Sequence, residues 1–190
     1  MMDELDRARS GDARAFDALA RAHERALYSH VARILGPGPD AEDVVQDAFV
    51  SAWRSISGFE GTSFKAWLFR IARNRAIDVI RAQKRRAELP LDPPDDEGGS
   101  PGWAEPAAGG PQLAEIAAGH EAREAVEAAL SLVPVEQRDA LLLRDVEGFS
   151  YEEIAIITVS ELGTVKSRIH RARVTVRNEL VAKGWKGSAG

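Results

Sequence analysis

Apolar residues recur along most of the chain at the spacing of an α-helix, and no stretch of useful length alternates between apolar and polar residues. Residues three, four and seven positions apart share one face of a helix, so this pattern predicts helices rather than strands. The predicted helices cover residues 12–35, 40–56 and 63–86 in the first half of the chain, and 135–145, 150–158 and 160–180 in the second. We therefore expect an all-α fold.

A segment rich in proline and glycine separates the two groups of helices. Residues 88–111 contain six prolines and five glycines, and this composition does not sustain a helix or a strand. The segment is also acidic, as in a flexible connector. We therefore predict two small helical domains, at residues 1–87 and 121–190, joined by a flexible acidic linker at residues 88–120.

Several predicted helices begin at residues that can cap them. A side-chain oxygen at a helix start accepts hydrogen bonds from backbone N–H groups that have no partner within the helix. Asp12, Asp40 and Ser160 are in position to do so. Ser150 and Glu153 have the spacing of a capping box, in which two residues satisfy each other's backbone N–H groups. These signals set the expected starts of four helices.

The last two predicted helices form a helix-turn-helix pattern. In the second of them, apolar residues give one buried stripe, and the basic residues point away from it; these are Lys166, Arg168, Arg171, Arg173 and Arg177. A short helix, a tight turn and a basic helix can place side chains in the major groove of DNA. An ordinary solvated basic helix is the alternative interpretation.

The distribution of charge supports contact with nucleic acid, although the net charge of the chain is −5. Residues 63–86 carry eight basic side chains and one acidic one, and residues 164–186 carry seven basic side chains and one acidic one. Local charge matters more for binding than the sum. The two basic segments predict two separate DNA contacts in a chain that binds DNA weakly by itself.

Aromatic and basic residues are closely mixed in residues 59–81. Basic side chains bind phosphates and aromatic faces accept unstacked bases, so this mixture suits single-stranded DNA. Asn74 offers both a donor and an acceptor to a base edge. Phe59, in a predicted loop, is the better candidate for touching a base, whereas Phe64 and Trp67 have helical spacing and are expected in the core.

The predicted helix at residues 40–56 carries an acidic face, with Asp43 and Asp47 one turn apart and Gln46 beside them. Carboxylates near a helix N-terminus are favourable by themselves, so simple solvation is one explanation. Because a negative face repels DNA, the functional alternative is a docking surface for a basic partner.

The residues also exclude several classes of function. The chain has no cysteine, its four histidines are scattered, and no nucleophile stands beside a base, so we expect no enzyme, metal, cofactor or small-molecule substrate. The acidic N-terminus does not fit a signal peptide, and no segment is long enough to span a bilayer. A cytoplasmic protein without membrane insertion is the expectation.

Together these segments resemble the extracytoplasmic-function (group IV) sigma factors of bacterial RNA polymerase, in the sigma-70 family. Residues 40–53 are similar to the helix by which family members dock onto the polymerase clamp, and residues 59–81 to the segment that captures and melts the minus-ten promoter element. Residues 132–143 and 163–173 are similar to the domain that reads the minus-thirty-five element. Four motifs in this order are far more specific than one helix-turn-helix.

The resemblance implies roles for individual residues. For the single-stranded minus-ten element it implies Phe59, Lys65, Arg70, Arg73, Asn74 and Arg81. For the minus-thirty-five duplex it implies Ser160, Thr164, Lys166, Ser167, Arg168, His170, Arg171 and Arg173. For polymerase binding it implies Asp40, Asp43, Gln46, Asp47, Phe49 and Trp53. The implied partners are core RNA polymerase, promoter DNA and an inhibitory anti-sigma factor, and the implied targets are stress or envelope-signal genes.

This chain departs from the family pattern at the turn of the helix-turn-helix. Family members usually place a glycine there, where this chain has Thr158, Val159 and Ser160. A β-branched residue tolerates a positive φ poorly, so the turn must adopt a different conformation or carry strain. Ile156 also stands where the family usually has a polar residue, which predicts an exposed apolar side chain.

Two other functions fit part of the pattern. An autonomous helix-turn-helix regulator would bind palindromic operators as a dimer without polymerase, and an interaction adaptor would use its basic helices to bind acidic partners. The acidic surroundings and the aromatic-basic segment argue against the regulator, and the adaptor leaves the loop aromatics unexplained.

Overall fold

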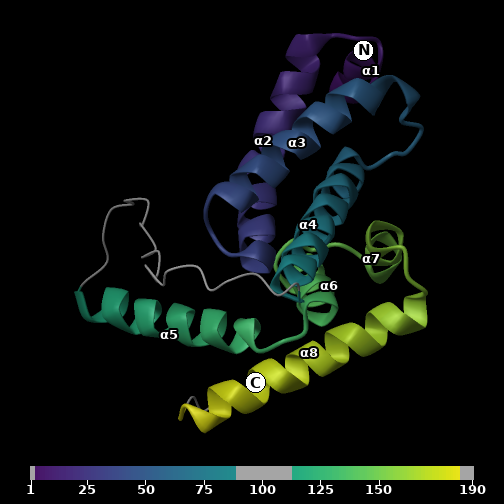
Figure 1. Cartoon of the computed structure of the whole chain (residues 1–190). Coiled ribbons are helices and arrows are strands. Elements are labelled where there is room, and N and C mark those ends of the chain that lie inside the picture. The colour runs from purple at the N-terminus through teal and green to yellow at the C-terminus, as the bar shows by residue number, and fades with distance from the viewer. Residues whose placement is uncertain (1–2, 89–112, 185–190) are drawn as a thin grey trace. The chain divides into compact units, whose positions relative to one another are not determined.

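The computed structural model of the chain describes residues 3–88 and 113–184 (Figure 1). All secondary structure within these two ranges is helical, which confirms the predicted fold class. The chain divides into two compact units, one formed by the N-terminal helices and the other by most of the C-terminal ones. Most of the predicted linker lies outside the described residues.

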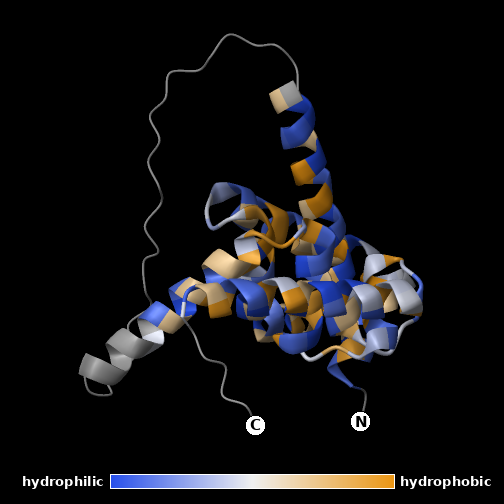
Figure 2. Ribbon diagram, turned by 90° about the horizontal axis from the view of Figure 1, so that it is seen from below, coloured by the Kyte–Doolittle hydropathy of each residue, from blue (hydrophilic) through white to orange (hydrophobic). Residues whose placement is uncertain are grey.

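The N-terminal unit contains α1 (Glu4–Arg9), α2 (Ala13–Leu35), α3 (Pro39–Ser55), the 3₁₀ helix η1 (Ile56–Gly58) and α4 (Phe64–Glu88). Helices α2, α3 and α4 pack against one another, and α1 packs on α2 and η1. Hydrophobic and hydrophilic residues are interspersed along each helix (Figure 2), as expected for amphipathic helices that bury one face. The largest buried side chains of this unit are Leu27, His30, Val31, Leu68 and Phe69. The sequence pattern missed α1, because six residues are too few to show a period.

The start of α2 agrees with the sequence. Oδ1 of Asp12 accepts hydrogen bonds from the N–H groups of Arg14 and Ala15, at 3.0 Å and 3.2 Å. The same carboxylate pairs with Arg7 of α1. The hydrogen bond from Arg7, and then that from the Ala15 N–H, hold the pKa of Asp12 below its ordinary value. The predicted cap is confirmed, and it also ties α1 to α2.

The predicted cap of α3 is wrong. The helix begins at Pro39 after Gly38, and the side chain of Asp40 caps nothing. Proline suits the first turn because its missing N–H would have no partner there. Oδ2 of Asp40 instead accepts a hydrogen bond from Nε2 of Gln83 on α4, at 2.8 Å.

Helix α4 begins where the sequence predicts, and its buried face is wide. Ser63 precedes the helix as predicted, and its Oγ accepts a hydrogen bond from the Ala66 N–H at 3.2 Å. The helix buries Leu68 and Phe69 completely, whereas Ile71 is only half-buried. The long helix packs against both α2 and α3, so its buried face is wider than a single stripe.

The C-terminal helices are α5 (Leu113–Ser131), α6 (Val135–Asp145), α7 (Tyr151–Thr158) and α8 (Leu162–Ala182). Helix α8 packs against α5 and α6. The fully buried side chains include Leu142, Leu143, Ile154, Ile157, Val165 and Ile169. Helix α5 begins inside the predicted linker, so the expected domain start at residue 121 falls within this helix.

Candidate nucleic-acid interface

The helix-turn-helix in the C-terminal unit starts from a formed capping box. The Ser150 N–H donates to Oε2 of Glu153 at 2.8 Å, and the Glu153 N–H donates to Oγ of Ser150 at 3.1 Å. Ile154 and Ile157 of α7 are fully buried. The two hydrogen bonds confirm the predicted capping box, and the two isoleucines form the buried face of α7.

The turn after α7 carries the strain that the sequence suggested. Val159 has a φ of +49°, and it is the one non-glycine residue with positive φ in the described parts of the chain. A β-branched side chain is costly in that region. Val159 is 78% exposed and Ile156 is 62% exposed, which confirms the expected apolar spot on the surface.

Helix α8 begins at Leu162, so Ser160 is not its cap as predicted. The hydroxyl of Ser160 instead accepts a hydrogen bond from Nη1 of Arg168 at 2.8 Å. Ser167 donates to the carbonyl of Thr164 at 2.9 Å. The backbone N–H groups at the start of α8 therefore carry no side-chain cap from the turn.

The predicted duplex-binding residues differ in exposure. Lys166, His170, Arg171 and Arg173 are exposed, whereas Ser160, Thr164, Ser167 and Arg168 are half-buried. Helix α8 thus presents a run of exposed cations beside a row of shorter hydrogen-bonding groups. Side chains of these kinds are able to contact phosphates and base edges.

A cluster around Tyr151 holds three cations at the start of the helix-turn-helix. The guanidinium of Arg144 lies 4.8 Å from the centre of the Tyr151 ring, and Nζ of Lys166 lies 5.9 Å from it. Arg173 donates from Nε to Oδ2 of Asp145 at 3.0 Å and from Nη2 to Oδ1. The hydrogen bonds to Asp145 raise the pKa of Arg173 above its ordinary value. The cluster therefore orients charges that long side chains would otherwise leave mobile.

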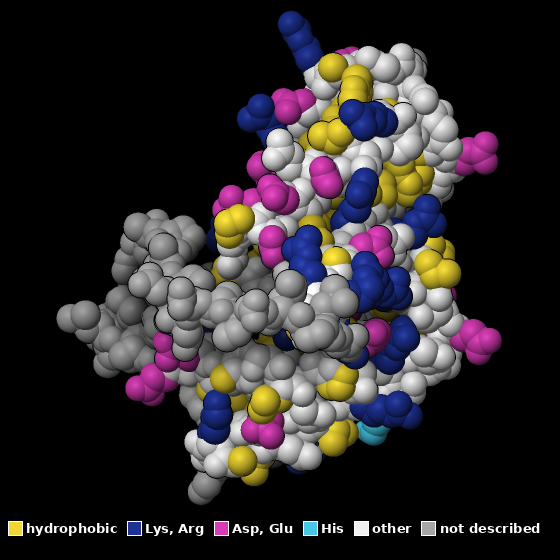
Figure 3. All heavy atoms as spheres, viewed as in Figure 1, with side chains coloured by type: hydrophobic (Ala, Val, Ile, Leu, Met, Phe, Trp, Pro, Cys, Tyr) yellow, Lys and Arg dark blue, Asp and Glu magenta, His cyan; other side chains and the backbone are white. Residues whose placement is uncertain are grey.

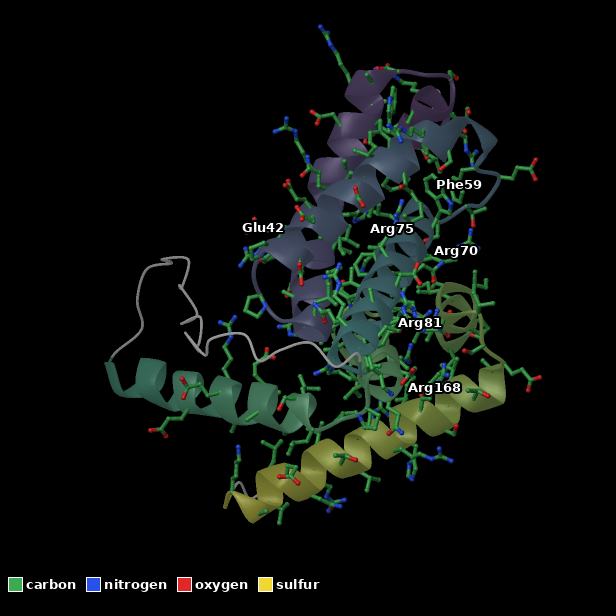
Figure 4. All side chains as sticks on the ribbon, viewed as in Figure 1. Glu42, Phe59, Arg70, Arg75, Arg81 and Arg168 are labelled. Atoms are coloured by element: carbon green, nitrogen blue, oxygen red, sulfur yellow. The ribbon has the colours of Figure 1, made fainter. Side chains whose placement is uncertain are left out.

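In the N-terminal unit, helix α4 carries most of the predicted single-strand contacts (Figure 4). Asn74 and Arg81 are exposed, and Lys65 and Arg70 are half-buried. Arg73 is only 9% exposed, so its side chain belongs to the packing of this structure rather than to an open surface. Four of the five predicted α4 residues are therefore accessible to solvent.

The loop between η1 and α4 contains a stack of aromatic rings. Phe59 lies against Trp67, with 4.5 Å between ring centres and 23° between planes. Trp67 is also 5.9 Å from Phe64, and that ring is buried. Trp67 is half-buried rather than fully in the core, and Phe59 is half-buried as well. Phe59, which is predicted to contact a base, is therefore already stacked on Trp67.

Acidic side chains lie over α3 and basic ones over α4 on the face in Figure 3. Asp43, Gln46 and Asp47 are exposed on α3. Arg75 of α4 approaches Asp47, with 3.9 Å between Nη1 and Oδ2. At more than half exposure on each side, such a pair adds little stability. The acidic face is thus open to an outside partner.

Two adjoining hollows run between α2 and α3 and share Arg21, Glu24 and Phe49. The first hollow is also lined by Phe16 and Trp53, with 5.1 Å between their ring centres. Together the two hollows form a groove beside the acidic face, with an apolar floor and a charged rim. It contains both aromatic residues, Phe49 and Trp53, that were predicted to bind a protein partner.

Sequence patterns missed several residues of these surfaces. Tyr151, Arg144 and Asp145 form the cation cluster, and Arg9 and Arg75 reach across from other helices. Helical periodicity shows which face of one helix is buried, but it does not show which side chains of two helices meet. The one sequence signal for the cation cluster was Tyr151 itself, directly after the capping residue Ser150.

The part of the chain described by the structure contains no group of three or more histidine, aspartate or glutamate side chains able to hold a metal. Among the same residues, no helix has the length and apolar character needed to cross a membrane.

Family comparisons match both units. The Sigma-70 region 2 model matches residues 19–86, and the Sigma-70, region 4 model matches residues 123–176. The chain is 36% identical to the ECF RNA polymerase sigma-E factor of Escherichia coli strain K12, over 93% of this chain and 92% of that protein. It is also 36% identical to the RNA polymerase sigma-H factor of Pseudomonas aeruginosa, over 93% and 91%.

Solved structures show the same likeness. The sigma factor RpoE from Bartonella quintana, in complex with the anti-sigma factor NepR, has a TM-score of 0.68 and 29% identity, over 87% of this chain and 96% of that one. CnrH in complex with the cytosolic domain of CnrY has a TM-score of 0.67 and 28% identity, over 94% and 96%.

Proposed function

The chain belongs to the extracytoplasmic-function RNA polymerase sigma factors of the sigma-70 family, and from this premise we propose how its surfaces divide the work of a sigma factor. A sigma factor directs core RNA polymerase to specific promoters and starts transcription there. The observation that carries our assignment is the separation of charge, with exposed cations on α4 and α8 and exposed carboxylates on α3. DNA and polymerase would therefore meet different helices.

Helix α8 would read the minus-thirty-five duplex. Lys166 and Arg171 are exposed and would engage phosphates or guanine edges, with His170 beside them. Arg168 and Arg173 are held by Ser160 and Asp145, so they would position the helix on the backbone rather than read bases. Thr164 and Ser167 complete the proposed surface.

The loop before α4 and the helix itself would capture the minus-ten element. Phe59 offers an aromatic face, and Lys65, Arg70 and Arg81 would follow the phosphates of the unpaired strand. Asn74 is exposed and would bond a base edge. We leave Arg73 out of this set because it is buried. Unstacking a base costs on the order of a few kcal/mol, and contacts with the unpaired bases would offset this cost.

Helix α3 and the adjoining groove would dock on core polymerase. Asp43, Gln46 and Asp47 would face a basic polymerase surface, while Phe49 and Trp53 would bury apolar area from the same partner. Asp40 would contribute less, because it already accepts a hydrogen bond from Gln83.

The family and the solved relatives also bear on regulation. Both solved relatives are complexes with a second protein, and one of those proteins is named as an anti-sigma factor. We therefore expect an inhibitory protein partner for this chain, action in the cytoplasm with polymerase, no catalytic activity of its own, and a stress or envelope-signal regulon. The autonomous operator-binding regulator is not favoured, because both matched families are sigma-70 regions.

Reconstitution with core RNA polymerase tests the function. The complex is mixed with a pool of duplexes that carry a randomised promoter region, the retained DNA is sequenced, and the recovered promoter is used in run-off transcription. We expect a selected promoter and a transcript only when both proteins are present. If the chain selects a palindromic duplex without polymerase and never binds polymerase, the assignment fails.

A charge swap tests the docking face. Asp47→Arg should abolish polymerase binding, while circular dichroism shows an unchanged helix content. The double variant with Asp47→Arg and Arg75→Asp restores the intramolecular pair but not the acidic face, so it should remain unable to bind. Recovery of binding in the double variant would mean that Asp47 acts on α4 rather than on polymerase.

A further inference from the structure

Arg9, the last residue of α1, reaches the loop that precedes α4. Its Nη2 donates a hydrogen bond to the carbonyl of Gly61. Its guanidinium carbon lies 5.2 Å from the centre of the Phe59 ring. Its Nη1 lies 3.3 Å from Oδ1 of Asp6 on the same helix. One side chain thus joins α1 to both the backbone and the aromatic ring of the loop.

The loop is tightly arranged around the same ring. A Cβ atom at Gly61 would lie 2.5 Å from Phe59 Cε2 and 2.7 Å from Cζ. Glycine is therefore required at position 61 for the ring to lie over the loop backbone. Phe59 is held by Trp67, by Arg9 and by the lack of a side chain at Gly61.

Helix α1 is itself anchored away from the loop. Arg7 pairs with Asp12 at the start of α2, and Ala8 is fully buried. The anchor matters because Arg9 can fix the loop only if its own backbone is fixed. The contacts therefore form a chain from α2 through α1 to Phe59.

From these contacts we infer that Arg9 is a positioning residue for base capture: it holds Phe59 and the carbonyl of Gly61 in the geometry that receives an unpaired promoter base. This inference rests on the proposed function of the loop. A loop ordered in advance pays less entropy when it binds, so Arg9 would strengthen capture without touching DNA itself. Neither helical periodicity nor the resemblance of residues 59–81 points to α1 for this role.

The test uses the complex of the full chain with core polymerase and two DNA probes. The first is the promoter recovered by selection, with its minus-ten region left unpaired by mismatches. The second is a duplex that keeps only the upstream element. Arg9→Ala should weaken binding of the first probe by about fivefold, because one charge-assisted hydrogen bond and one ring contact are lost. Binding of the second probe should not change.

Three variants control the interpretation. Arg14→Ala removes the same charge from an exposed position on α2 and leaves both the loop contacts and the Arg7–Asp12 anchor in place, so it should bind both probes as the original chain does. Arg9→Lys should restore part of the binding, because an ammonium group lacks the planar fork that reaches two partners at once. Gly61→Ala should displace Phe59 from the other side and reproduce the Arg9→Ala defect.

A spectroscopic measurement separates positioning from unfolding. With Trp53, Trp103 and Trp185 replaced by phenylalanine, the emission comes from Trp67 alone. Arg9→Ala should increase acrylamide quenching of Trp67, because Phe59 no longer stays stacked on it, while the thermal midpoint stays close to that of Arg14→Ala.

The outcomes distinguish the inference from the function on which it rests. If the original complex selects no promoter, the proposed function fails. If it does select one, but Arg9→Ala and Arg14→Ala bind the unpaired probe equally and quench equally, Arg9 has no positioning role.

Discussion

The two candidate DNA surfaces of this protein prepare for binding in different ways. Helix α8 presents cations directly, and several are oriented by partners that DNA does not need to displace, such as Asp145 beside Arg173 and Tyr151 beside Lys166. The loop before α4 presents an aromatic ring that is already stacked on Trp67. Helix α8 thus has cations that are already oriented before DNA binds, and the loop has an aromatic ring that is already oriented.

This difference follows from what each surface would bind. Duplex DNA offers a regular array of phosphates, so preformed positive charge captures it and the affinity depends strongly on salt. An unpaired base offers a flat face in addition, so stacking on an aromatic ring contributes a part of the affinity that adds nothing to the salt dependence set by the phosphate contacts. The predictions below test this division, from the largest expected effect to the smallest.

Removal of two cations from α8 should have the largest effect. The double variant with Lys166→Ala and Arg171→Ala should weaken binding of the upstream duplex by the polymerase complex on the order of a hundredfold, and should reduce the salt slope by about two. Electrophoretic mobility shifts over a series of salt concentrations measure both quantities. Arg14→Ala, an exposed cation on α2, is the control. A variant slope equal to that of the original chain would remove α8 from the phosphate contacts.

Removal of the loop ring should have a smaller effect with a different signature. Phe59→Ala should weaken binding of the unpaired probe by about tenfold, which is within the range for one base on one aromatic ring, and should leave the salt slope unchanged. Because Trp67 already covers part of the ring, we expect the lower end of that range. Open-complex formation, followed with 2-aminopurine in the minus-ten region, reports the loss. Equal weakening on the upstream duplex would place Phe59 in the fold instead.

The sequence predicted the C-terminal surface better than the loop, for a physical reason. Capping and the alternation of Val165 and Ile169 with Lys166 and Arg171 are local rules within one helix. The loop depends on contacts between Arg9, Phe59 and Trp67, and Arg9 lies on α1, far in sequence from the other two. No local rule predicts them.

The errors at helix starts have the same origin. Asp40 and Ser160 satisfy the residue preference of a cap, but each is bonded to a side chain elsewhere, Gln83 and Arg168 respectively. Tertiary contacts outweighed the local preference at both positions. Asp12 also bonds a side chain of another helix, but it has two oxygens: Oδ2 accepts from Arg7 while Oδ1 stays free to cap the helix. The cap at Ser150 also formed.

The strained turn offers a test of how rigidly α8 is held. Val159→Gly should stabilise the C-terminal unit by about 1 kcal/mol, because glycine adopts a positive φ without a steric penalty, less the entropy that glycine adds to the unfolded chain. Urea unfolding followed by circular dichroism measures the change. Affinity for the upstream duplex should stay within about twofold, since the bonds that orient the cations do not involve Val159. Weaker DNA binding in a more stable variant would show that the strained turn itself sets the position of α8.

Protonation of Asp12 should have the smallest effect, and only on the N-terminal surface. Its folded-state pKa is lowered by the hydrogen bond from Arg7 and by those from the helix N–H groups. The carboxylate therefore stabilises the fold above its ordinary pKa of 3.8, and this contribution is lost as the pH falls through the lowered folded value. Asp12→Asn removes the charge while keeping an acceptor for the N–H groups. The stability difference between the original chain and this variant, from urea unfolding at pH 7 and near pH 3, should therefore shrink at the lower pH. A difference that stays constant would mean that the charge of Asp12 does not fasten α1, and with it Arg9, to the unit that carries the loop.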